Sequence, residues 1–179
     1  MLARFSFIDK DGSFEMRGNP KAIYQTMVEI RYQIVAAAGQ KIRQALIIGT
    51  RYAVCRRQFQ TVQGSKIERK IIDYQAHMFK FGPLLAESYI LMLVGVELHG
   101  YRNQMNIEVK QGKFKTLNLL HHFTSGLKSL YSTMAYDGIE LVRVNCGGAG
   151  YSAWSYLPQI YSDYSPVPVY EGDNTVMAQ

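Results

Sequence analysis

The sequence has few of the residues that mark disulfide scaffolds and metal centres. Its 179 residues include only two cysteines, Cys55 and Cys146, which stand far apart with no Cys or His at metal-ligand spacing. This pattern predicts two buried free thiols in a reducing compartment. His121 and His122 are adjacent, so on a helix their side chains point about 100° apart and a shared metal is not expected. We therefore predict no metal site.

Long apolar runs, targeting motifs, internal repeats and low-complexity tracts are also missing. The most apolar stretch, residues 84–98, is interrupted by two glutamates and a glycine, which predicts no membrane span. Residues 1–5 do not have the layout of a signal peptide. Residues 176–179 do not form a peroxisomal targeting signal of the Ser-Lys-Leu type. The sequence therefore contains no motif from which a compartment can be predicted.

Acidic residues are the minority among the charges. The chain has 20 Lys and Arg against 14 Asp and Glu, a formal charge of +6 and a pI near 9.3. This balance favours an anionic partner such as nucleic acid, a phosphate-bearing cofactor or an acidic membrane. We predict no nucleic acid, because basic residues are not interleaved with aromatics and no helix-turn-helix or finger pattern is present. The hydrophobic fraction of 47% is typical of a globular domain.

Apolar periodicity predicts three long helices. Asn19-Pro20 has the residues of a helix start, and Gly39 and Gly49 predict close contacts between helices. In the second helix, the positions predicted to pack include Met78 and Leu85. The predicted helices cover residues 21–58, 67–104 and 117–145, joined by polar segments at 60–66 and 103–116. We therefore predict an all-α fold, an antiparallel up-and-down helical bundle, after a short extended lead-in at residues 1–18.

One carboxylate, Glu171, stands in a stiff segment near the carboxyl end. Two prolines in residues 164–176 predict a strand-like connector, and Gly172 lets another group approach the backbone. A carboxyl flanked by Val169 and Tyr170 is a candidate for desolvation, which would make it a stronger base near neutral pH. The alternative is a surface loop with one acidic residue.

Two segments are candidates for holding phosphate. Arg56 and Arg57 end the first predicted helix, where basic side chains complement the helix dipole and guanidinium groups bind phosphate oxygens in bidentate fashion. Gly147, Gly148 and Gly150 form a weak phosphate-loop pattern, since the strand that usually precedes it is absent. The alternative is a glycine-terminated helix packed against a neighbour.

Four segments in order resemble the acyl-CoA oxidase branch of the acyl-CoA dehydrogenase superfamily over nearly the whole chain. The segments are RYAVCRRQF (51–59), IDYQ (72–75), CGGAGYS (146–152), and LP through DYSP to YEGDNTV (157–176). The resemblance implies that residues 19–179 are the first carboxyl-terminal helical domain of such an enzyme and that residues 1–18 lead in from its β-domain. The amino-terminal helical domain, the β-domain and the second carboxyl-terminal helical domain have no counterpart in this sequence.

The glutamate of the YEG motif is the catalytic base in that family, and Glu171 matches it. The resemblance implies that Glu171 removes a proton from the carbon α to a fatty acyl-CoA thioester while the β carbon passes hydride to FAD. The product is a trans-2-enoyl-CoA, and an oxidase returns the electrons to O₂ as H₂O₂. Tyr170, Gly172 and Arg31 are implied to lie at the substrate, with Arg31 as an orienting group.

The resemblance also assigns the cofactor contacts. FAD is implied to contact Arg56, Phe59, Gly147 and Gly148. The family arginine that matches Arg56 commonly reaches FAD across a subunit interface. This implies a homodimer or a complementary chain that carries the missing domains.

The oxidase reading has specific support and open alternatives. Asp173-Asn174 follows the oxidase form, whereas Gln60 and Val144 depart from the family pattern. An oxidase implies the peroxisome and fatty acid β-oxidation, with the mitochondrion as the alternative compartment. The alternative functions are an acyl-CoA dehydrogenase that passes electrons to an electron-transfer flavoprotein and a non-catalytic helical assembly subunit.

Overall fold

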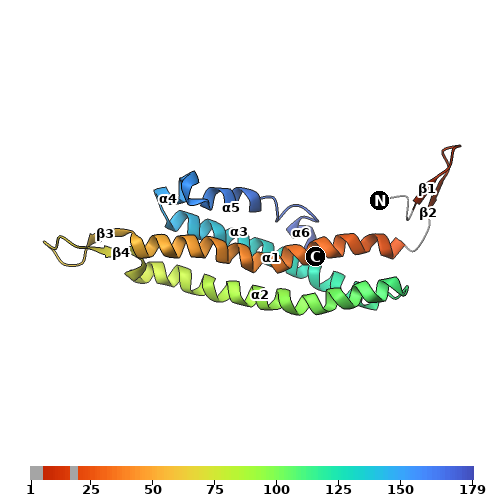
Figure 1. Cartoon of the computed structure of the whole chain (residues 1–179), viewed down its shortest axis with the longest axis horizontal. Helices are drawn as coiled ribbons and strands as arrows, with labels where there is room; N and C mark the ends of the chain where they lie inside the picture. The colour runs from red at the N-terminus through yellow and green to blue at the C-terminus, as the bar shows by residue number, and fades with distance from the viewer. Residues whose placement is uncertain (1–5, 17–19) are drawn as a thin grey trace.

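Three long helices lie side by side in the computed structural model, which describes residues 6–16 and 20–179 (Figure 1). The helices are α1 (Pro20–Cys55), α2 (Gln75–Lys110) and α3 (Lys115–Asn145). Each reverses direction relative to the one before it, and α1 packs against both others. The predicted all-α antiparallel bundle is therefore confirmed.

The remaining elements are short. Two antiparallel hairpins pair β1 with β2 and β3 with β4, and the second projects beyond one end of the bundle (Figure 1). The short elements are β1 (Ser6–Ile8), β2 (Phe14–Met16), β3 (Arg57–Gln60), β4 (Glu68–Lys70), η2 (Ile71–Asp73), α4 (Gly148–Tyr151), η3 (Ala153–Ser155), α5 (Leu157–Tyr164) and α6 (Asn174–Met177). The predicted extended lead-in is a hairpin over the described residues 6–16, whereas the predicted cap Asn19 lies outside the described residues.

The core lies where the three long helices meet, and two glycines of α1 permit their close approach. A Cβ at Gly39 would lie 2.7 Å from the backbone oxygen of Ser88 on α2. A Cβ at Gly49 would lie 2.5 Å from Cγ1 of Val142 on α3. Both distances are shorter than any side chain tolerates, so the prediction that these glycines mark helix contacts is confirmed.

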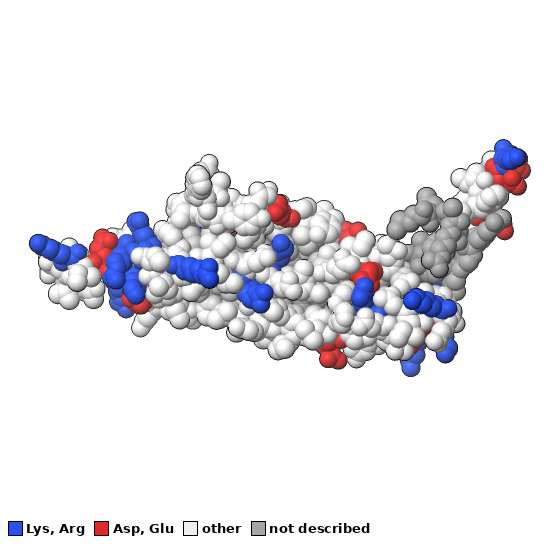
Figure 2. Space-filling view, in the orientation of Figure 1, with Lys and Arg blue, Asp and Glu red and all other residues white. Residues whose placement is uncertain are grey.

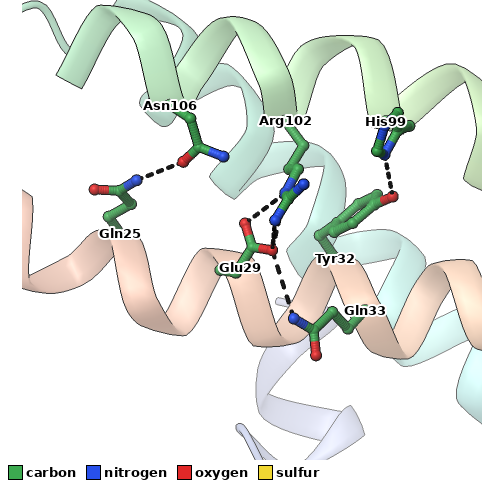
Figure 3. A network of polar contacts seen from close by, with 7 residues as sticks. All are labelled: Gln25, Glu29, Tyr32, Gln33, His99, Arg102 and Asn106. Carbon is green, nitrogen blue, oxygen red and sulfur yellow. Dashed lines mark hydrogen bonds and ion pairs between the residues drawn. The ribbon is translucent and has the colours of Figure 1, made fainter. Parts of the chain in front are cut away.

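The polar linker predicted at 103–116 is wrong, because α2 continues to Lys110. Figure 3 shows how α1 holds this part of α2: Arg102 forms an ion pair with Glu29 at 2.7 Å, and Gln25 Nε2 donates to Asn106 Oδ1 at 2.6 Å. The polar residues that suggested a linker therefore belong to α2. Some of them bond to α1, and the others face solvent.

The first helix also ends earlier than predicted. α1 stops at Cys55, and the next residues pair with Glu68–Lys70 in the β3–β4 hairpin, so the predicted loop at 60–66 is only the hairpin's tip. The strand residues are polar apart from Phe59 and almost all exposed, so they lack the alternation that predicts a strand.

The packed face of α2 differs in part from the predicted one. Met78 and Leu85 are exposed, whereas Leu84 and Leu98 are buried against the other helices. α2 is also the one helix of the described residues that is long and apolar enough to cross a membrane by composition, although core helices meet the same criterion and 33% of its apolar window is buried. The interruptions in residues 84–98 led us to predict no membrane span, but the composition of α2 does not exclude one.

The two cysteines differ in exposure. Cys146 is buried and burial raises the pKa of its thiol to about 11, whereas Cys55 is exposed, so the prediction of two buried thiols is wrong for Cys55. A thiol with that pKa forms about 100-fold less thiolate at neutral pH than one at the ordinary value of 9.0.

We expect iodoacetamide at about pH 8 to alkylate Cys55 in the folded protein and to leave Cys146 unmodified until the chain is denatured. Peptide mass spectrometry over a time course measures both rates. Equal rates in the folded protein would contradict the buried position of Cys146.

Candidate functional site

The segment around Glu171 is a compact turn that lies on α3, between α5 and α6 (Figure 1). Val167 N donates to Tyr164 O at 3.0 Å and Tyr170 N donates to Pro166 O at 3.1 Å. The prediction of a strand-like connector is therefore wrong. The proline φ angles that suggested extension fit successive turns equally well.

The backbone at Glu171 adopts a conformation that side chains rarely take. Its φ is 58°, and Gly172 follows with a φ of 107°. A left-handed glutamate costs on the order of 1–3 kcal/mol and persists only where the surroundings fix it. A Cβ at Gly172 would also lie 2.5 Å from Sδ of Met177. The turn therefore requires glycine at this position and requires other groups to hold the glutamate.

Arg31 is one of the groups that hold the turn. It is buried on α1, and its Nε donates to the backbone oxygen of Glu171 at 2.9 Å. Its Nη1 reaches Tyr24 and Ser125 at 3.5 Å. The structure thus brings together Arg31, Glu171 and Gly172, three of the residues predicted for the substrate region.

Lys128 of α3 is the second group, and it was not predicted from the sequence. The side chain is completely buried, and its Nζ donates to Pro168 O, Gly172 O and Asn174 Oδ1 at 3.1, 2.7 and 2.8 Å. Burial lowers the pKa of Lys128, and the carboxylates of Asp173 and Glu171 oppose that shift. The available signal was a lysine in the stripe of α3 that also contains the buried Tyr131.

Asn174 joins the turn to α3 more firmly. Its Nδ2 donates to Ser129 O at 3.1 Å and to Ser132 Oγ at 2.8 Å, and Ser129 Oγ donates to Asn174 O at 2.8 Å. Asp173 caps α6 by accepting from Thr175 N at 2.9 Å. The Asp173-Asn174 pair therefore fixes the end of the turn that carries Glu171.

The side chains of the turn remain open toward solvent. Glu171 is half-buried and Tyr170 is 44% exposed. Burial and the nearby Glu171 raise the pKa of Tyr170. The chain therefore fixes the backbone of this turn while one side remains free for a ligand or for another part of the protein.

A second location brings two of the predicted cofactor residues together. Arg56 and Gly147 line a pocket of about 360 Å³ at the end of the bundle, together with His77 and Lys80. His77 is buried, its Nε2 has no hydrogen-bond partner, and burial lowers its pKa with a smaller contribution from Lys80. Two cationic side chains and an unpaired imidazole nitrogen suit the phosphates of a cofactor such as FAD.

The other two predicted cofactor residues are not in that lining. Phe59 is 69% exposed in β3, with a φ of 63°. Gly148 begins α4, and a Cβ there would meet nothing within 4 Å. Both residues therefore lie on open surface beside the pocket.

Positive charge gathers at the end of the bundle that carries this pocket. Residues 51–73 contain six basic and two acidic side chains, and Figure 2 shows Lys and Arg concentrated near the β3–β4 hairpin. The charge that favours an anionic partner is thus concentrated where Arg56 lies.

The turn and the pocket are far apart within one chain. Lys128, which holds the turn, and Cys146, which lines the pocket, are separated along α3 by about 18 residues, or about 27 Å of helix. Figure 1 accordingly places α6 well away from β3. One chain therefore presents two separate candidate regions, a carboxylate turn and a basic pocket.

The comparisons with known proteins agree with this architecture. A family model described as "Acyl-CoA oxidase, C-alpha1 domain" matches residues 24–179. Peroxisomal acyl-coenzyme A oxidase 1 of Arabidopsis thaliana is 40% identical over 178 residues, and the human protein of the same name is 37% identical over 177 residues. Each match covers 99% of this chain.

Solved structures show the same similarity. Acyl-CoA oxidase 1 of Arabidopsis thaliana superimposes with a TM-score of 0.85 at 38% identity, over 97% of this chain and 26% of that one. Acyl-CoA oxidase-2 of Caenorhabditis elegans, bound with FAD, ascaroside-CoA and ATP, has a TM-score of 0.85 at 34% identity, with the same coverages.

The fold and the matched region define a helical domain of the kind found in acyl-CoA oxidases. The chain belongs to the acyl-CoA oxidase family, in which it corresponds to the C-alpha1 domain. It spans 27% of the length of the curated relatives it matches.

Proposed function

We propose that this chain is the part of a fatty acyl-CoA oxidase that supplies the catalytic base, Glu171. The observation that carries the proposal is the turn at Glu171, whose unusual backbone is held by Arg31 and Lys128. A carboxylate held at one position and open on one side fits a general base that must reach a substrate proton.

In the proposed reaction, the Glu171 carboxylate removes a proton from the α carbon of the acyl thioester. FAD, held by Arg56, Phe59, Gly147 and Gly148, would supply the hydride acceptor for the β carbon, and O₂ would be the final acceptor of the two electrons. The products are a trans-2-enoyl-CoA and H₂O₂. The backbone N–H of Glu171 polarises the thioester carbonyl, and Tyr170 and Gly172 border the substrate.

Arg56, Phe59, Gly147 and Gly148 form the proposed cofactor surface. The fit of this surface to FAD rests on the basic pocket and the unpaired nitrogen of His77. Because about 27 Å of α3 separates Lys128 at the turn from Cys146 at the pocket, we propose that each flavin site combines regions of two subunits in a homodimer.

The proposed compartment is the peroxisome, and the proposed role is fatty acid β-oxidation, as the names of the relatives suggest.

The test of the proposed activity is to purify the protein with any chain that accompanies it, record flavin absorbance, add a fatty acyl-CoA and follow H₂O₂. Flavin reduction without H₂O₂, but with electron transfer to an electron-transfer flavoprotein, would instead identify a dehydrogenase. Absence of flavin in every preparation would reject the proposal that this chain is part of a flavin-dependent enzyme.

We expect Arg56→Met to weaken flavin binding by about 10- to 100-fold, the loss typical of one charge-assisted hydrogen bond. Flavin retained after gel filtration, and its release on dilution, measure the effect. Arg43→Met, at an exposed position of α1, the helix that ends just before Arg56, is the matched control and should retain flavin. Equal retention by both variants would remove Arg56 from the cofactor surface.

A further inference from the structure

The ammonium of Lys128 has no chemical step in the proposed reaction, yet it contacts the turn on both sides of the base. Pro168 O precedes Glu171, whereas Gly172 O and Asn174 Oδ1 follow it. An ammonium has three N–H donors, so these three oxygens satisfy all of them. The side chain is thus fully committed to the turn.

The contacts close the turn into a ring. Asn174 N donates to Pro168 O at 3.1 Å, so the two ends of the 168–174 segment meet at the carbonyl that also accepts from Lys128. Glu171 lies at the middle of this segment, and Arg31 binds its carbonyl from α1. Two buried cations on different helices therefore hold the main chain before, at and after the base.

Stability alone is a poor explanation for this lysine. The three acceptors are uncharged oxygens, and burying an ammonium among them costs free energy that an apolar side chain of similar size avoids. An apolar side chain, however, would fix no carbonyl and would place no positive charge behind the turn. The arrangement therefore gives what a base requires, which is a single backbone position and a favourable field for its ionised form.

We propose that Lys128 is a positioning residue for the base, which holds the 168–174 turn so that the Glu171 carboxylate is presented to the substrate in one place. The inference rests on the proposed function of Glu171. It concerns the rate of proton removal, and it requires no contact between Lys128 and either the substrate or the cofactor.

The test compares Lys128→Met with Lys128→Arg in the flavin-bound enzyme. We expect Lys128→Met to lower kcat by about 10- to 100-fold, the loss typical of a displacement near 1 Å, with KM changed by less than about twofold. Flavin content should stay constant, because the basic pocket is far from the turn. The kinetic isotope effect for an α-deuterated acyl-CoA should increase, and Lys128→Arg should recover part of kcat. Lys115→Met, at an exposed position of the same helix, is the control.

A second variant decides the matter if Lys128→Met does not fold. Asn174→Ala removes one of the three acceptors from a half-buried position, and we expect a smaller loss of kcat at unchanged flavin content. A folded Lys128→Met enzyme with normal kcat overturns the proposal, as does a loss of kcat that only follows the loss of folded flavoprotein. Glu171→Gln, measured in parallel, separates these results from failure of the proposed function, since retained turnover there would remove the base itself.

Discussion

Replacing Glu171 by Gln is expected to lower kcat by about 10²- to 10⁴-fold while flavin remains bound. Glutamine has nearly the same shape but cannot accept the α proton, and general-base catalysis typically contributes a factor of this size. The turn should persist, because Arg31 and Lys128 bind main-chain oxygens that the substitution leaves in place. H₂O₂ release under saturating acyl-CoA measures kcat. The flavin absorbance of the purified variant measures how much flavin remains bound.

The matched control is Asp163→Asn, which neutralises an exposed carboxylate on α5 and should leave turnover unchanged. If the Glu171→Gln enzyme still turned over at a normal rate, Glu171 would not be the base. If both variants lost activity, the effect would reflect the loss of negative charge near the turn and not a proton transfer.

A second large effect is expected at the glycine turn after α3. A Cβ at Gly150 would lie 1.8 Å from the backbone oxygen of Arg143, so Gly150→Ala must displace main chain. We expect the free energy of unfolding to fall by at least about 3 kcal/mol, the upper range of overpacking costs. Urea denaturation followed by circular dichroism measures the change.

Gly148→Ala provides the comparison from the same turn. Nothing lies within 4 Å of the added methyl group, so the unfolding free energy should stay within about 0.5 kcal/mol of the original. If FAD approaches Gly148 as proposed, flavin affinity should nevertheless fall at least about tenfold. Unchanged affinity in this variant would place the cofactor elsewhere, whereas an unstable Gly148→Ala protein would contradict the open space beside α4.

The long helices were predictable to different degrees, and the reason is the distribution of apolar residues. α3 begins within two residues of its predicted start, because its apolar residues recur in one stripe that faces the core. α2 has exposed apolar residues such as Phe79 and Leu93 in addition to its buried leucines, so periodicity identified a helix but only part of its packed face.

The candidate site was predictable only where a motif marks it. The YEG motif identified Glu171, and the family resemblance identified Arg31. Lys128 was not predicted, since lysine is almost never fully buried and its place in the stripe of α3 that contains Tyr131 is a weak signal for such an exception. The β3–β4 hairpin was missed because exposed polar strands carry no alternation, although it continues directly from Arg56.

The groups that hold the turn bind main-chain oxygens of Pro168, Glu171 and Gly172. Substitution does not remove a carbonyl, so the frame that places the carboxylate is largely independent of the side chains displayed on the same turn. Val169 and Tyr170, which both point into accessible space, can then vary in size and polarity without moving the base. If Glu171 is the base proposed above, a lineage could exchange these side chains while the position of proton removal stays fixed.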